Sequence, residues 1–173
     1  MKVLSGVGLA LCGAVLFASV AAAQSPIRRT PGAPADDEVG MNIALQVGGA
    51  TYQFSGRGEC GHEPRGYIYA TPAKMWTVRQ SEGPRSVTLT FWSPASGEAD
   101  MFNLYVTSGG KSHQTNTVTG KDAGPTKGSG TVTFAPAGTG GVFTVNATAA
   151  SGAKINGTIK CDAFRAIVAE GGN

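Results

Sequence analysis

The residues most able to do chemistry lie in one short segment, Glu-Cys-Gly-His-Glu at residues 59–63. A thiolate, an imidazole and carboxylates are all zinc ligands, but a structural site needs about four, commonly in pairs two to four residues apart. One residue separates Cys60 from His62, and the remaining candidates are the distant His113 or Cys161. We therefore expect no metal and no cofactor, and we interpret this segment as a loop beside a disulfide.

An export signal supports the disulfide. Lys2 gives residues 1–23 a positive start, an uncharged stretch follows, and the segment ends in three alanines typical of a cleavage site. Cys12 lies inside this signal, so only Cys60 and Cys161 remain after cleavage, in an oxidising compartment. We predict that they form a disulfide in a periplasmic or extracellular protein with no stable membrane insertion. The short, alanine-rich signal is typical of bacteria.

No pattern in the chain indicates catalysis. The two histidines, His62 and His113, stand outside any G-x-S-x-G motif. Five acidic residues that could act in hydrolysis are scattered through apparent loops: Glu59, Glu63, Glu82, Glu98 and Asp100. We therefore assign no catalytic residue and favour a protein that is not an enzyme. Two alternatives stay open: a small secreted hydrolase using a loop histidine, and a protease inhibitor presenting residues 108–130.

The charge excludes another class of function. Without Lys2 the chain has 13 basic and 11 acidic residues, which gives a net charge of about +2. The basic residues are scattered rather than clustered, whereas nucleic-acid binding requires a basic patch or stripe. We expect no nucleic-acid partner, and the sequence does not indicate an oligomeric state.

The apolar pattern predicts an all-β fold. Residues 24–40 are rich in proline and charge and predict a disordered linker, and residues 41–173 predict one domain. Alternation with period two, broken by glycine and proline, favours an antiparallel β-sandwich of about 8–10 short strands, with a barrel as the alternative. The strands are expected at residues 43–47, 50–54, 67–71, 74–80, 86–92, 101–106, 131–135, 141–147 and 153–161, with residues 164–169 as a terminal strand or cap.

Details of this pattern make further predictions. Gly48–Gly49 predicts a hairpin turn, and residues 107–130 predict a long loop with one weak strand near 115–119. Cys161 and Trp76 should face the core. The remaining core is expected from Val87, Leu89, Phe91, Phe102, Leu104, Val106, Phe134, Phe143, Val145 and Ile159.

Aromatic residues on outward faces form the candidate binding surface. If Leu89 and Leu104 face the core, Trp92, Asn103 and Tyr105 face outward on neighbouring strands. Tyr67 and Tyr69 are possible extensions of this surface. Such a platform would suit sugar stacking or contact with a protein. The leading hypothesis is therefore an exported, non-catalytic binding or interaction module with a protein or carbohydrate partner.

The framework resembles one known family. Gly58-Glu59-Cys60 and the closing segment GAKINGTIKC at residues 152–161 are similar to the bacterial lipoprotein-antigen family, small exported β-proteins bridged between an early cysteine and one near the C-terminus. The resemblance implies an exported surface or periplasmic β-protein without established catalysis. It carries over no functional residue beyond the bridge, because the lipid-bearing cysteine of the family has no counterpart here.

Overall fold

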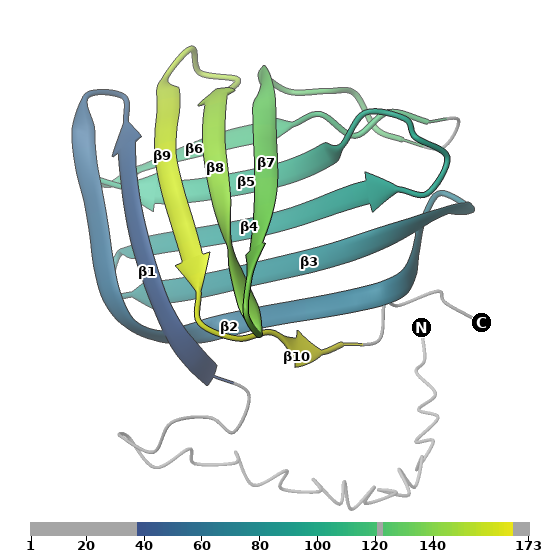
Figure 1. Ribbon diagram of the computed structural model, residues 1–173. Coiled ribbons are helices and arrows are strands. Elements are labelled where there is room, and N and C mark those ends of the chain that lie inside the picture. The colour runs from purple at the N-terminus through teal and green to yellow at the C-terminus, as the bar shows by residue number, and fades with distance from the viewer. Residues whose placement is uncertain (1–37, 121–122, 168–173) are drawn as a thin grey trace, which may run out of the picture. The chain divides into compact units, whose positions relative to one another are not determined.

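The computed structural model describes residues 38–120 and 123–167, and these residues are all-β, as predicted (Figure 1). They contain no helix, and so none that could cross a membrane. The predicted signal at 1–23 and most of the predicted linker at 24–40 lie outside the described residues. The first strand begins at Glu38, inside the predicted linker.

Ten strands build one sheet. They are β1 Glu38–Val47, β2 Ala50–Ile68, β3 Thr71–Glu82, β4 Arg85–Pro94, β5 Met101–Ser108, β6 Lys111–Asn116, β7 Ser129–Ala137, β8 Gly140–Thr148, β9 Lys154–Cys161 and β10 Arg165–Ala166. Their order is β6-β5-β4-β3-β2-β1-β9-β8-β7, and all these neighbours are antiparallel. The short β10 pairs in parallel with β2.

The sheet folds over at strand β2. Its first half pairs with β1 and its second half with β3, and Glu59 is paired on both sides. In Figure 1 the layer of β1, β9, β8 and β7 crosses in front of β3 to β6, with β2 bending from one layer to the other. The edge strands approach each other at a bridge between Asn116 and Lys127. Both predicted architectures therefore fit: the layers resemble a sandwich, and the single sheet is nearly a closed barrel.

The long β2 corrects the predicted loop at the cysteine. Residues 54–67 lie within this 19-residue strand rather than in a loop. Its glycines allow backbones to pass closely at the bend: a Cβ on Gly58 would lie 2.9 Å from the carbonyl oxygen of Arg79 on β3. Glycine commonly signals a turn, whereas the glycines of β2 permit this strand to bend between two layers.

Two further boundaries differ from prediction. The expected strand at 67–71 is divided by a hairpin turn at residues 69–70, because β2 ends at Ile68 and β3 begins at Thr71. The weak strand expected at 115–119 is β6, which begins earlier at Lys111 and pairs with β5. The Gly48–Gly49 hairpin is confirmed by the pairing of Val47 with Ala50.

The predicted disulfide joins the bend of β2 to the end of β9. Cys60 and Cys161 are bonded, their Cα atoms are 6.3 Å apart, and both side chains are buried. Strand β1 lies between β2 and β9 in the sheet, so the bond fastens the strands on either side of it. A closed loop of about a hundred residues removes on the order of 4–5 kcal/mol of denatured-state freedom in the chain-entropy model.

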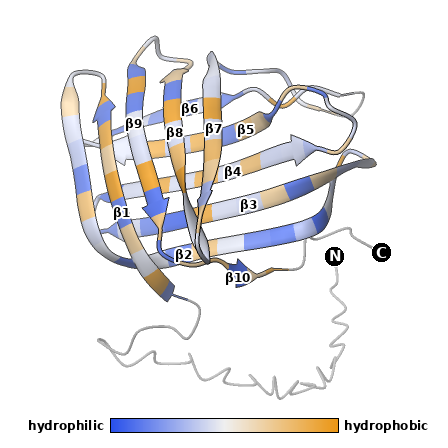
Figure 2. Ribbon diagram, viewed as in Figure 1, coloured by the Kyte–Doolittle hydropathy of each residue, from blue (hydrophilic) through white to orange (hydrophobic). Residues whose placement is uncertain are grey.

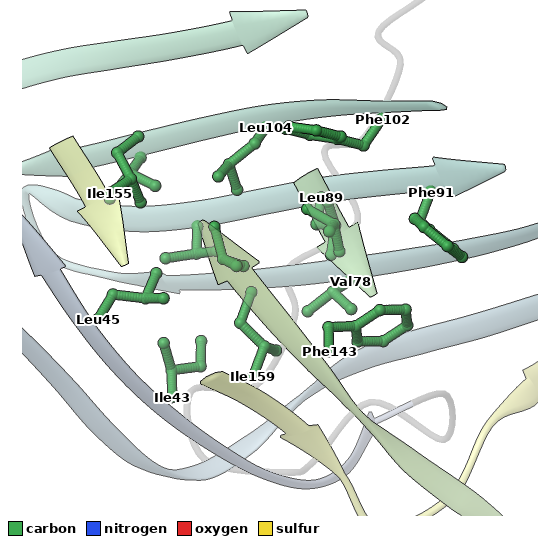
Figure 3. Packing of buried hydrophobic residues seen from close by; sticks show 14 of the residues in the cluster. Ile43, Leu45, Val78, Leu89, Phe91, Phe102, Leu104, Phe143, Ile155 and Ile159 are labelled. Atoms are coloured by element: carbon green, nitrogen blue, oxygen red, sulfur yellow. The ribbon is translucent and has the colours of Figure 1, made fainter. Parts of the chain in front are cut away.

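The core fills the space between the layers (Figure 3). Of the ten residues predicted for it, nine are buried, and Phe134 is partly buried against the others. Trp76 is also buried, as predicted. Figure 2 shows hydrophobic and hydrophilic residues alternating along β9, the pattern of a strand with one face inward.

Truncation of Leu104 tests this strand register. Leu104 is fully buried opposite Leu89, so Leu104→Ala should lower the free energy of unfolding by about 3–5 kcal/mol, measured by chemical denaturation. Tyr105→Ala, the next residue on the same strand but facing solvent, should change it by less than about 1 kcal/mol. Equal effects of the two substitutions would contradict the register.

Candidate functional site

The structure does not bring Trp92 and Tyr105 together. Tyr105 on β5 lies opposite Thr88, whereas Trp92 lies opposite Met101 at the other end of the same two strands. Four residues along a strand correspond to about 13 Å. Asn103 lies between them on the outward face, half-buried. One compact ligand cannot stack on both aromatic rings.

Trp92 instead takes part in a second, smaller apolar cluster. Its buried members are Ile68, Ala73, Met101 and Val118, with Trp92 and Ala123 packed against them. Val118 and Ala123 belong to the segment after β6, which therefore covers this end of the outward face. Trp92 is only partly accessible, and its contacts are those of a packing residue.

Three tyrosines are the large hydrophobic side chains that stay exposed in the described part of the chain. Their exposed fractions are 47% for Tyr67, 49% for Tyr69 and 43% for Tyr105. The hydroxyl of Tyr105 accepts a hydrogen bond from the side chain of Gln114 on β6. Tyr67 lies at the end of β2, and Tyr69 lies in the turn that follows this strand. The predicted binding residues therefore divide into two separate surfaces.

The turn that presents Tyr69 is strained. Tyr69 and Ala70 have φ values of 45° and 67°, in the left-handed region that favours glycine. The hairpin turns at 48–49 and 109–110 have similar geometry but use Gly-Gly. For a residue with a Cβ, this conformation costs roughly 1–2 kcal/mol. The chain therefore places a tyrosine where its other turns place glycine.

Tyr69 lines a hollow of about 730 Å³ between loops distant in sequence. We call it the Tyr69 hollow; its lining residues are Ile68, Tyr69, Thr71, Glu98, Ala99, Asp100, Met101, Thr117, Thr119, Gly120, Gly130 and Thr131. The tyrosine ring lies against Gly120, where an added Cβ would be 3.5 Å from the ring. The loops after β2, β4 and β6 thus meet at one aromatic side chain.

The side chains that line the Tyr69 hollow favour some classes of ligand over others. It offers one aromatic face, several threonine hydroxyls and the two carboxylates of Glu98 and Asp100, and no described basic residue lines it. Carboxylates accept strong hydrogen bonds from hydroxyl and ammonium groups, and an aromatic face packs against apolar C–H groups. The hollow therefore suits a polyhydroxylated or amino-bearing ligand and disfavours an anion.

Tyr67 lines a neighbouring hollow of about 440 Å³ with a different character. Its lining includes Arg65 and Lys74 together with the prolines Pro64, Pro72 and Pro94. The basic residues and the rigid prolines separate this hollow in chemistry from the one at Tyr69. Tyr67 therefore does not extend the Tyr69 hollow.

His62 is held in an aromatic cluster rather than in a solvated loop. Its ring stacks on that of Trp76 with centroids 4.6 Å apart and planes 13° apart, and Phe164 approaches edge-on. Burial lowers the pKa of His62; nearby Lys74 lowers it further and Glu63 partly opposes both. The Nε2 atom is buried and has no hydrogen-bond partner among the described residues. This environment stabilises a neutral imidazole.

No described cluster has the make-up of a metal site or a catalytic triad. Within residues 38–120 and 123–167, no three His, Cys, Asp or Glu side chains gather as a metal would require. His113 Nδ1 lies 3.2 Å from Ser151 Oγ, which is the contact a nucleophile and base would make. In the part of the chain described, no carboxylate pairs with His113 to orient it.

The residues that sequence reasoning missed are the walls of the Tyr69 hollow. The sequence pattern presents Glu98 and Asp100 only as scattered acids, and it places Thr117 and Thr119 in a weak strand within a long loop. Their one detectable signal was the loop itself, since long loops rich in Gly, Ser and Thr often carry function. Its contact with Tyr69 depends on the sheet topology.

Comparisons with models of protein families, with curated proteins and with solved structures gave no match. The resemblance to lipoprotein antigens therefore stays a prediction from the residues that carry it. Function must be argued from the site alone.

The environment of His62 predicts a pH dependence of stability. Because the pKa is lower in the folded state, the unfolded chain takes up the proton first as the pH falls below about 6.5. The contribution of His62 to the free energy of unfolding should thus be constant above this pH and decline below it. His62→Phe keeps an aromatic ring against Trp76 and should remove this part of the decline, measured by denaturation at pH 5 to 8. His113→Gln, with His62 intact, should retain it; the same pH profile in all three proteins would contradict the assignment.

The turn strain predicts a stabilising substitution. Ala70→Gly relieves the left-handed conformation without touching Tyr69, and should raise the free energy of unfolding by about 1 kcal/mol despite the added freedom of the unfolded chain. Thermal and chemical denaturation measure the change. A loss of stability would show that the turn carries no strain.

Proposed function

We propose that the protein is an exported, non-catalytic binding module that recognises a carbohydrate in the Tyr69 hollow. The observation that carries the proposal is the left-handed backbone at Tyr69 and Ala70, where glycine would be easier to accommodate. Backbone strain of this kind persists where the rest of the structure compensates for it, and it clusters at ligand sites. Here it presents a half-exposed aromatic ring beside a hollow.

The lining supports a sugar as the ligand class. A sugar ring has an apolar C–H face, which suits the Tyr69 ring, and hydroxyl groups at its edge. Those hydroxyls can donate to Glu98 and Asp100 and exchange hydrogen bonds with the hydroxyls of Thr71 and Thr131. Neutral and amino sugars fit this set, whereas sulfated or acidic sugars would face the two carboxylates.

The disulfide supports export. A bridge between Cys60 and Cys161 is compatible with an oxidising location, and periplasmic or secreted proteins retain such bonds. The proposed signal peptide at residues 1–23 would deliver the chain there. In this setting the folded domain would meet glycans of a cell envelope or of the surroundings.

A glycan array covering neutral, amino, acidic and sulfated sugars tests the proposal. We expect binding to neutral or amino sugars, and we expect Tyr69→Ala to weaken it at least tenfold through loss of the stacking surface. Tyr105→Ala is the matched control, because it removes a tyrosine of similar exposure from another face. Tyr69→Gly should lose binding as well while folding normally, since glycine suits the turn.

Two outcomes would contradict the proposal. One is that no glycan binds the wild-type protein at millimolar concentration. The other is that a glycan binds equally well to wild type and Tyr69→Ala but not to Tyr105→Ala, which would move the site to the outward face of β5.

A further inference from the structure

A third hollow lies where three hairpin turns converge, and none of its residues borders the Tyr69 hollow. Its volume is about 750 Å³, and it is walled by the turns between β1 and β2, β5 and β6, and β8 and β9. The first and third are fastened together, because the Gly48 amide donates to the carbonyl oxygen of Lys154 at 2.8 Å. In Figure 1 these two turns lie at the same end of their strands. We call it the lysine hollow.

The charge of this hollow is positive. Lys111 and Lys154 line it with His113 and Ser151, and no carboxylate from residues 38–120 or 123–167 does. The ammonium group of Lys154 is held by the hydroxyl of Thr148 at 2.9 Å rather than by an acid. Across the described residues, neither lysine makes an ion pair.

The acids of the described chain are engaged elsewhere. Four of them pair with basic residues: Glu38 with Arg57, Glu59 with Arg79, Glu82 with Arg85, and Asp162 with Lys160. Glu63 accepts a hydrogen bond from the backbone amide of Arg65, and Glu98 and Asp100 line the Tyr69 hollow. The two hollows are therefore opposite in charge, and the lysines have positive charge without a described carboxylate partner.

The walls also leave room for a ligand to reach the backbone. Gly49, Gly109 and Gly152 line the hollow, and a Cβ built on any of them would meet no atom within 4 Å. Peptide N–H groups in turns can bind anions through their dipoles, although the N–H group of Gly152 already donates to the carbonyl oxygen of Ala149 at 2.9 Å. Ser151 Oγ and His113 Nδ1, 3.2 Å apart, form a polar pair on the same wall.

We propose that the lysine hollow binds the phosphate or sulfate group of a soluble ligand. Two ammonium groups and a hydroxyl form a suitable donor set for a tetrahedral oxyanion. Among the described residues no Phe, Tyr or Trp lines the hollow, and its apolar lining is limited to small side chains such as Val47 and Ala153. The absence of a large apolar anchor favours a soluble phosphate or sulfate ester over a lipid headgroup. The site is independent of the proposed carbohydrate site.

Titration of the ¹⁵N-labelled protein with inorganic phosphate and with sulfate, at constant ionic strength against chloride, tests the proposal. We expect saturable amide shifts at residues 48–50, 108–111 and 151–154, and a dissociation constant that rises with added salt. Lys111→Gln with Lys154→Gln should weaken binding at least tenfold. The double variant Lys74→Gln and Lys160→Gln removes the same charge elsewhere and should retain binding within about threefold.

Two kinds of result would overturn the proposal. Shifts that do not saturate, or equal weakening in both double variants, would show only a general charge effect and overturn the site. A second arm uses phosphatidylglycerol vesicles at matched phosphate concentration: binding to vesicles at least tenfold tighter than to inorganic phosphate, lost in the Lys111 and Lys154 variant, would overturn the soluble ligand in favour of a membrane surface. Melting temperatures check that all variants fold.

Discussion

The bend of strand β2 is the constraint on which the rest of the molecule depends. One half of the strand pairs with β1 and the other with β3, so a single hydrogen-bonded ribbon belongs to both layers. The bond between Cys60 and Cys161 lies at this bend and fastens it to the end of β9. The layers thus enclose one core, because the strand that joins them is held by β1 on one side and by β3 on the other.

This constraint also places the candidate sites. Where β2 leaves the bend it continues to Ile68, and the turn that follows places Tyr69 among the loops after β4 and β6. Where β2 begins, its turn from β1 meets the turns of β5–β6 and β8–β9 and forms the lysine hollow. The two ends of one long strand therefore contribute to two hollows of opposite charge, each built from segments far apart in sequence.

Local patterns were sufficient to predict the parts of the fold that obey a period of two. Leu89, Phe91, Leu104 and Val106 alternate with polar residues, and all four are buried as expected. The two cysteines outside the predicted signal were enough to predict the bridge. The prediction of a loop at residues 54–67 was wrong. Glycines there were expected to signal a turn, but they also permit a strand to bend where backbones pass closely.

The candidate site was less accessible to prediction. Tyr69 was identified as a possible binding residue, but as an extension of a platform with Trp92 and Tyr105 that the strand register separates. The turn at Tyr69 could not be predicted, because the Tyr-Ala sequence carries no turn signal. Its strain is evident only from the backbone angles. The acids and threonines around it come from other loops, and only the topology brings them together.

We propose that ligand recognition occurs at Tyr69, between three loops that the sheet brings together. Chemical-shift mapping of the ¹⁵N-labelled protein with the best-binding oligosaccharide tests it most directly. Binding in the Tyr69 hollow should give the largest amide shifts at residues 68–71, 98–101 and 117–120, the segments that line it. Shifts confined to the outward face around Tyr105 and Thr88, with none at residues 68–71, would contradict it.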